Sequence, residues 1–183
     1  MRFAEGPIPG AWTIDPAPHA DERGRFMRAW CADEFAAHGI AFTPLQANLG
    51  FSHRAGTLRG LHYQVAPHEE AKLVRCTRGR VFDVLVDLRP RSPTFGRWFG
   101  VELSAENGRM LFVPPLCAHG YQTLDDASEI YYMASAAYAP DAARGLRYDD
   151  PTAAIRWPLP PVALSEQDRT WPHLDPKEQR LVP

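Results

Sequence analysis

The sequence has no long apolar run, no marked excess of charge of one sign and few cysteines. No apolar stretch among its 183 residues approaches the ~20 residues that a membrane-spanning helix needs. The formal net charge of −2 gives no electrostatic basis for binding nucleic acid or an anionic membrane. The N-terminus also lacks the apolar region of a signal peptide. We therefore expect a cytoplasmic protein that has neither nucleic acid nor a membrane as its partner.

The three cysteines, Cys31, Cys76 and Cys117, are an odd number and include no Cys-x-x-Cys pair. This pattern favours reduced, structural thiols over a disulfide framework. The sequence also lacks internal repeats and low-complexity linkers. It has neither a glycine-rich phosphate loop nor a dinucleotide fingerprint, which argues against nicotinamide chemistry. The length and the 45% of hydrophobic residues predict one globular domain over 1–183.

Short segments punctuated by 18 prolines and 13 glycines indicate strands and turns. The clearest strand is 80–88, where the apolar residues at even positions predict one apolar face. Further strands are expected at 98–103, 110–113, 120–124 and 129–134. Such spacing is typical of an all-β sandwich or barrel. Two short helices are expected beside it, one over 33–39 with Asp33 as N-cap and Gly39 as its stop, and one starting at Ser165.

The stretch 56–64 places a histidine, His62, inside a predicted strand, close to Arg59 and ahead of Lys72. A strand that directs these side chains into one cavity would form a site for an anionic substrate and a proton transfer. The spacing resembles the first motif of the cupins, small β-barrels that usually bind metal through His-x-His. Here the second histidine is replaced by Gln64, so His62 is predicted to act as a base and not as a ligand.

Ten motifs together resemble the nucleotide-sugar 3,5-epimerases typified by dTDP-4-dehydrorhamnose 3,5-epimerase. They occur in the family's order and cover about residues 10–175. The motifs span 21–26, 46–48, 57–64, 72–75, 79–84, 92–96, 103–107, 113–120, 138–140 and 164–168. The resemblance implies a cupin-type jelly-roll β-barrel with a few short peripheral helices. It also implies a homodimer with exchanged N-terminal strands, and catalysis without a metal or an organic cofactor.

The substrate implied by the resemblance is a nucleoside-diphosphate 4-keto-6-deoxy sugar, above all dTDP-4-dehydro-6-deoxy-D-glucose. Its C4 ketone acidifies the protons on C3 and C5, and inversion needs a base and an acid on opposite faces. His62 matches the base, because an imidazole can take a carbon-bound proton near neutral pH. Asp168 matches the carboxylate that orients it. Lys72 would stabilise the enolate oxygen, and Tyr132 matches the acid.

Further positions match residues that bind the substrate in the family. Tyr138 matches an aromatic residue that stacks on the nucleotide base, and Arg23 and Arg59 suit the diphosphate. Other matches to positions that line the site are Phe26, Gln46, Asn48 and His119. Strand geometry alone adds that Asp83 could orient His119.

Structural readings compete with these roles. His62 could be a core histidine, Tyr132 could serve packing, with Tyr138 then the acid, and Asp168 could cap a helix. A metal site from His62, Glu69 and His119 would suit iron, zinc or manganese. Because Gln64 replaces one cupin ligand and Lys72 would repel a cation, we expect neither metal nor cofactor.

The chain also departs from the family's pattern, chiefly by losing carboxylates. The departures are Arg28, Ala47, Gly50, Ala143 and Tyr148. They leave open which nucleotide and sugar are recognised and whether C3, C5 or both are inverted. The alternatives are a monofunctional epimerase on a CDP- or GDP-linked sugar, a 3,4-ketoisomerase, and a cupin that binds a nucleotide sugar without turning it over.

Overall fold

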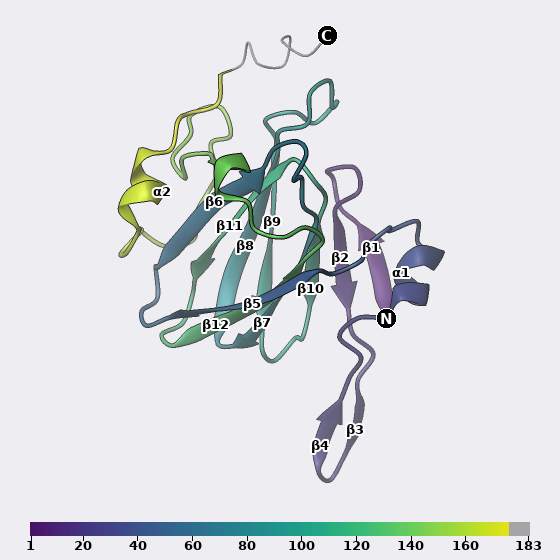
Figure 1. Ribbon diagram of the computed structural model, residues 1–183. Helices are drawn as coiled ribbons and strands as arrows, with labels where there is room; N and C mark the ends of the chain where they lie inside the picture. The colour runs from purple at the N-terminus through teal and green to yellow at the C-terminus, as the bar shows by residue number, and fades with distance from the viewer. Residues whose placement is uncertain (176–183) are drawn as a thin grey trace.

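Antiparallel β-strands form most of the computed structural model, which describes residues 1–175 (Figure 1). A six-stranded sheet contains, in spatial order, β1 (Arg2–Glu5), β2 (Trp12–Asp15), β10 (Met110–Val113), β7 (Lys72–Arg78), β12 (Ser128–Ala134) and β5 (Gln46–Ser52). A five-stranded sheet contains β13 (Ala143–Gly145), β6 (Leu58–Gln64), β11 (Cys117–Thr123), β8 (Arg80–Asp87) and β9 (Trp98–Ser104). The predicted strands are all present, although β11 begins three residues earlier than predicted.

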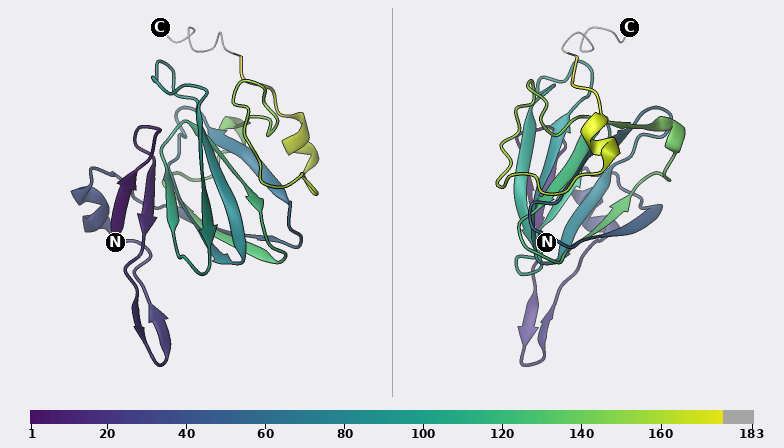
Figure 2. Two further views of the ribbon diagram at one scale, coloured as in Figure 1. Left: turned by 180° about the vertical axis from the view of Figure 1, so that it is seen from behind. Right: turned by 90° about the vertical axis from the view of Figure 1, so that its left-hand side faces the viewer.

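The two large sheets face each other and enclose a shared core, which confirms the predicted all-β jelly roll (Figures 1 and 2). Val74, Leu111 and Ile130 of the six-stranded sheet pack there with Leu85 and Leu103 of the five-stranded sheet. Their burial supplies the main driving force for folding, about 1.5–3 kcal/mol for each large apolar side chain. At one end of this core the sheets diverge, and the cavity described below opens between them.

The predicted apolar face of β8 is present, but the opposite face of the strand is buried as well. Val84 and Val86 point outward, where the C-terminal segment covers them through Leu146 and Leu174. The opposite face, which carries Asp83, points into the sandwich. A period-2 pattern shows which residues share a face, but it does not show what a distant segment will cover.

Both predicted helices are present, but the predicted N-cap of the first was wrong. Helix α1 (Ala32–Ala37) begins after Cys31, whose extended backbone makes it the N-cap, and Asp33 lies in the first turn. A carboxylate there still favours the helix through the macrodipole. The left-handed Gly39, with a φ of 73°, follows the helix end as predicted. Ser165 caps α2 (Glu166–Thr170) by accepting a hydrogen bond from the backbone N–H of Asp168.

A two-stranded hairpin of β3 (His19–Asp21) and β4 (Gly24–Phe26) projects from the body of the molecule (Figures 1 and 2). The preceding strand β2 pairs with β10 of the same chain and so extends the six-stranded sheet. No helix in residues 1–175 is long and apolar enough to cross a membrane. A single domain over 1–183 stays a prediction, because residues 176–183 lie outside the described part.

Candidate active site

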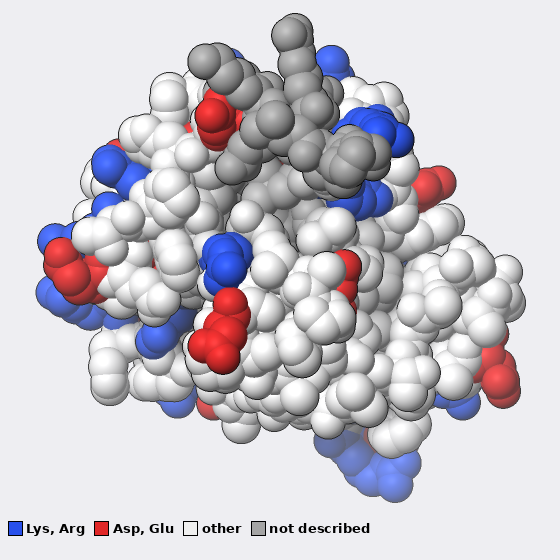
Figure 3. Space-filling view, turned by 45° about the horizontal axis from the view of Figure 1, so that its top comes forward, with Lys and Arg blue, Asp and Glu red and all other residues white. Residues whose placement is uncertain are grey.

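A pocket of about 740 Å³ lies between the diverging ends of the two large sheets. The five-stranded sheet, the six-stranded sheet and the segment around α2 each contribute to its wall. This volume suits a ligand of the size of a nucleotide sugar, since ligand pockets usually measure about 300–1,000 Å³. On the face shown in Figure 3, acidic and basic side chains of the described residues are interspersed and form no patch of one sign.

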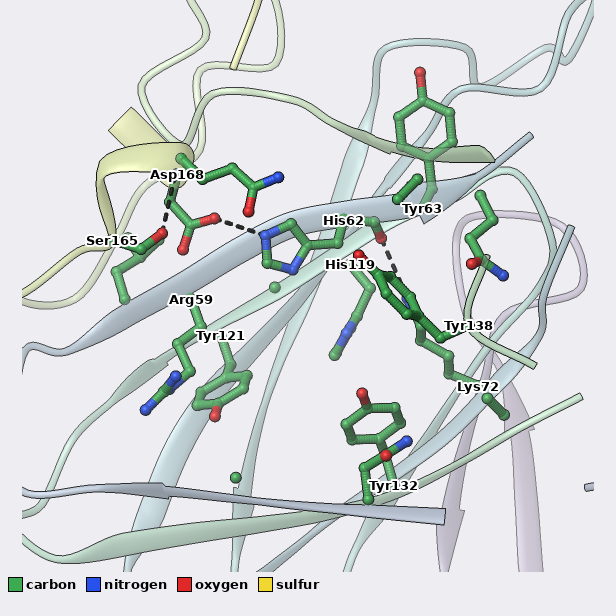
Figure 4. Close-up of a pocket in the computed structure, with 18 of the residues that line it drawn as sticks. Arg59, His62, Tyr63, Lys72, His119, Tyr121, Tyr132, Tyr138, Ser165 and Asp168 are labelled. Atoms are coloured by element: carbon green, nitrogen blue, oxygen red, sulfur yellow. Dashed lines mark hydrogen bonds and ion pairs between the residues drawn. The ribbon is translucent and has the colours of Figure 1, made fainter. Parts of the chain in front are cut away.

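His62 and Asp168 form a hydrogen-bonded pair in this pocket (Figure 4). The His62 Nε2 atom lies 2.6 Å from Asp168 Oδ1, and among residues 1–175 the Nδ1 atom is the ring nitrogen without a carboxylate partner. Burial raises the pKa of Asp168, but hydrogen bonds and charge from His62, with the backbone N–H of Gly60, lower it more, so the net shift is downward. The buried carboxylate is therefore ionised at neutral pH and can stabilise a protonated imidazole.

Glycines allow the chain to bring these two residues together. Gly60 and Gly120 lie where β6 and β11 approach closely, and a Cβ on Gly60 would lie 2.5 Å from the Gly120 Cα. Gly145 on β13 makes room for Trp171, which follows α2, and a Cβ there would lie 2.3 Å from the indole ring. Helix α2, which carries Asp168, can therefore dock against β6.

Tyr132 enters the pocket from the opposite, six-stranded sheet (Figure 4). Burial first, and then the negative charge of Glu70, raises the pKa of Tyr132, so its phenol stays protonated at neutral pH. The pocket thus has an imidazole on one wall and a proton donor on the other. Such a pair can remove a proton from one face of a bound molecule and return one to the opposite face.

Lys72 lies on the same sheet as Tyr132 and is 7% exposed. Its Nζ atom lies 2.8 Å from Glu70 Oε1 and donates to the carbonyl oxygen of His62 at 3.3 Å. The ammonium is thus held between the two walls of the pocket, where it can stabilise an oxyanion.

His119 and Asp83 form a second histidine–carboxylate pair, as strand geometry predicted. The His119 Nε2 atom lies 2.9 Å from Asp83 Oδ1, and both residues are buried. His119 lies opposite His62 in the register of β11 and β6 and also lines the pocket.

Four more of the predicted residues line the pocket: Gln46, Asn48, Arg59 and Tyr138. The Gln46 side chain donates to Asn48 Oδ1 at 3.0 Å and accepts from the Tyr138 N–H at 3.0 Å. Arg59 is held by the Phe51 carbonyl oxygen. Tyr138 is 63% exposed at the rim, where an aromatic base could stack on its ring.

Arg23 and Phe26 do not join the others within one chain. Both lie on the projecting β3–β4 hairpin, where Phe26 is 77% exposed and Arg23 pairs with Asp21. Neither of them lines the pocket of its own chain.

The profile of the family described as dTDP-4-dehydrorhamnose 3,5-epimerase matches residues 5–176. The chain belongs to this family. It is 43% identical over 175 residues to a dTDP-4-dehydrorhamnose 3,5-epimerase from Sinorhizobium fredii, which covers 95% of this chain and 90% of that one.

Solved structures of the epimerase family have the same fold. One is dTDP-4-dehydrorhamnose 3,5-epimerase from Bacillus anthracis with TDP and pyrophosphate bound. It is 36% identical to this chain with a TM-score of 0.92, and the match covers 94% of this chain and 99% of that one. Another is dTDP-6-deoxy-D-glucose-3,5-epimerase from Legionella pneumophila in complex with dTDP-4-keto-L-rhamnose, at 36% identity, a TM-score of 0.89, and 100% and 94% coverage.

Gln64, which stands where a metal-binding cupin would have a histidine, has a structural role in this epimerase-family chain. Its buried amide donates to the carbonyl oxygens of His68 and Ala137 and so fixes the segment that leads into β7. Glu69, the third ligand of the alternative metal site, is not among the residues that line the pocket. Within residues 1–175, no three His, Cys, Asp or Glu side chains are grouped to hold a metal ion.

Several residues that line the pocket were missed from the sequence, among them Glu70, Tyr121 and Trp171. Strand alternation could have found Tyr121, because it lies two residues after His119 and so shares its face. Burial raises the pKa of Tyr121 to about 12, so this second phenol is also protonated at neutral pH. Glu70 precedes β7 by two residues, and Trp171 lies beyond α2, so no regular spacing pointed to either of them.

Proposed function

We propose that this chain epimerises C3, C5 or both carbons of a nucleotide-linked 4-keto-6-deoxyhexose without a metal or organic cofactor. The substrate favoured by the family's name is dTDP-4-dehydro-6-deoxy-D-glucose. One observation carries the proposal: His62, which is paired with Asp168 of α2, and Tyr132 project into one pocket from opposite sheets (Figure 4). Membership of the epimerase family over residues 5–176 supports it.

The proposed reaction begins when the Nδ1 atom of His62 takes the proton from a carbon beside the ketone. The electron pair of that C–H bond moves to the C4 oxygen, and the ammonium of Lys72 stabilises the resulting enolate. Asp168 stabilises the imidazolium through the bond to Nε2. The Tyr132 hydroxyl then protonates the carbon from the other face, which inverts it, and both groups exchange protons with solvent before the next turnover.

The remaining residues of the site would hold the nucleotide. Arg59 suits the diphosphate, because a guanidinium binds phosphate oxygens at two points. Tyr138 would stack on the base from the rim, with Gln46 and Asn48 below it. The buried His119 would face the sugar, held by Asp83.

Proton NMR of the substrate in D₂O tests the activity directly. We expect the C3 and C5 signals of dTDP-4-keto-6-deoxyglucose to disappear with the purified protein, and much more slowly with His62→Ala. Loss of one signal would identify a monofunctional epimerase, and appearance of a 3-keto sugar would identify a ketoisomerase. If no analogue with a dTDP, CDP or GDP group exchanges, although the protein binds one of them, the chain is a binding cupin and the proposal is wrong.

The active form is proposed to be a homodimer in which the β3–β4 hairpin reaches the partner's pocket. The exposed Phe26 and Arg23 on that hairpin then become substrate-binding residues in a second copy. The outer face of β5 supports an interface, because Leu49 and Phe51 are exposed there.

Mixing two inactive variants tests this arrangement. A His62→Ala chain and an Arg23→Ala/Phe26→Ala chain should restore partial activity when they are co-expressed, because one pocket of each mixed dimer is intact. Light scattering that reports a monomer, or a mixture without activity, would refute the exchange.

We propose the cytoplasm as the compartment, because Cys31, Cys76 and Cys117 are all free. Thiols stay reduced there.

A further inference from the structure

The chain uses lysine sparingly, and one of its lysines is in the pocket. Of the 20 Lys and Arg residues, 18 are arginine, and the two lysines are Lys72 and Lys177. Lys72 is the only lysine that the structure describes, and it is almost fully buried beside Glu70. An ammonium is a compact charge on a flexible stem, so its position depends on the groups that anchor it.

Two anchors occupy the ammonium of Lys72. Its Nζ atom lies 2.8 Å from Glu70 Oε1 and 3.3 Å from the carbonyl oxygen of His62. A lysine ammonium has three N–H groups and accepts no hydrogen bond. Within residues 1–175 these two contacts leave one N–H for a ligand, on a side chain that lines the pocket.

The anchor at Glu70 is itself firmly held. The next residue, Ala71, exchanges hydrogen bonds with Ser135: its N–H donates to Ser135 Oγ at 2.8 Å, and its carbonyl oxygen accepts from the Ser135 N–H at 3.0 Å. Two residues before Glu70, the carbonyl oxygen of His68 accepts from Gln64 at 2.9 Å. Bonds on both sides therefore fix the backbone that presents Glu70, whose side chain is only 12% exposed.

A carboxylate repels an anionic substrate, so its presence in this pocket indicates that it has another function. Paired with Lys72, Glu70 makes the lysine site neutral overall, so the pair contributes little to the affinity for a diphosphate. Its negative charge also helps to keep Tyr132 protonated.

We propose that Glu70 is a positioning residue, which holds the Lys72 ammonium so that its remaining N–H meets the C4 oxygen of the substrate. This inference rests on the proposed function.

Steady-state kinetics of Glu70→Gln, Glu70→Asp and the adjacent Glu69→Gln test the proposal. Glu70→Gln should lower kcat about 10- to 100-fold, as expected when a catalytic group moves by about 1 Å. Its KM should stay unchanged or fall, because a negative charge leaves the pocket. The kcat of Glu70→Asp should lie between those of Glu70→Gln and the parent, and the kcat of Glu69→Gln should match that of the parent. A Glu70→Gln enzyme with the parent's kcat overturns the proposal, as does a loss confined to KM.

A second measurement needs no turnover, so it separates this proposal from the proposed function. In a Lys177→Arg background labelled with ¹⁵N-lysine, Lys72 gives the only lysine ammonium signal. We expect Glu70→Gln to shift this signal and to speed its hydrogen exchange. An unchanged shift and exchange rate overturn the role of Glu70, even if the parent is an active epimerase. If Glu70→Gln shifts the signal as expected but the parent turns over no 4-keto sugar, the positioning role of Glu70 stands and the proposed activity is refuted.

Discussion

Replacement of Asp168 by asparagine removes a charge from the histidine–carboxylate pair with little change in shape. A hydrogen bond to a charged group contributes about 1.5–3 kcal/mol. The Asp168 side chain is only 5% exposed, but that of His62 is 45% exposed, so solvent weakens the interaction and we take about 2 kcal/mol. This energy acts mainly once His62 has become an imidazolium. Asp168→Asn should therefore lower kcat roughly 30-fold, since 1.36 kcal/mol corresponds to a factor of ten in rate, and leave KM nearly unchanged.

The assay follows solvent deuterium entering C3 and C5 together with the formation of inverted product. Proton removal by His62 should slow in Asp168→Asn as much as turnover does. The double variant His62→Ala/Asp168→Asn should be no slower than His62→Ala alone, because the two residues act as a unit. Asp83→Asn provides the comparison, since it changes the carboxylate of the other pair, at His119, and should act mainly on KM. If Asp168→Asn turns over at the parent's rate, the pairing does not support catalysis and the reasoning fails.

Three further predictions concern the opposite wall, the docking of α2 and the stability of the fold. Tyr132→Phe should keep deuterium exchange at the substrate, but its rate of inversion should fall at least about 100-fold. If the rates of exchange and inversion fall equally, Tyr132 is not the group that returns the proton to the carbon. Gly145→Ala forces the ring of Trp171 away by its 2.3 Å contact and should slow turnover, with partial recovery in Gly145→Ala/Trp171→Ala; parent-like kinetics would contradict this. Burial raises the pKa of Asp87, but hydrogen bonds from Arg89 and neighbouring hydroxyl groups lower it more, so the folded pKa lies below the ordinary 3.8. The stability that Asp87 contributes is therefore present above about pH 4 and lost as pH falls further, and urea denaturation should show Asp87→Ala costing about 3 kcal/mol at pH 7 and progressively less as the pH falls below about 4.

Short-range patterns predicted the strands because alternation along a strand is a local property. The same alternation predicted the contact between Asp83 and His119, since both residues lie on neighbouring strands and on one face. Alternation also predicted the apolar face of β8, but it could not show which segment covers that face, because this segment comes from the far end of the chain. It also could not indicate that Cys31 would precede Asp33 as the N-cap of α1, because sulfur is a poor capping group and Cys31 makes no side-chain capping hydrogen bond.

The site itself was only partly accessible to reasoning from the residues. His62 and Asp168 are separated by 106 positions, and only the resemblance to a family suggested that they meet. Glu70 escaped notice because its importance comes from the Lys72 ammonium and the Tyr132 phenol, which two different strands bring to it. Arg23 and Phe26 have features of binding residues but lie on a hairpin that serves no pocket of its own chain.

The division of the pocket between two sheets gives the core an indirect role in stereochemistry. The imidazole and the phenol are carried by different hydrogen-bonded sheets, so the distance between them depends on how far apart the sheets are packed. Ile130 and Leu85 of the shared core help to set that spacing, although neither touches the pocket. A methylene gained or lost there would change how well a sugar fits between the imidazole and the phenol. Selectivity between C3 and C5 can therefore be altered by residues that never meet the substrate.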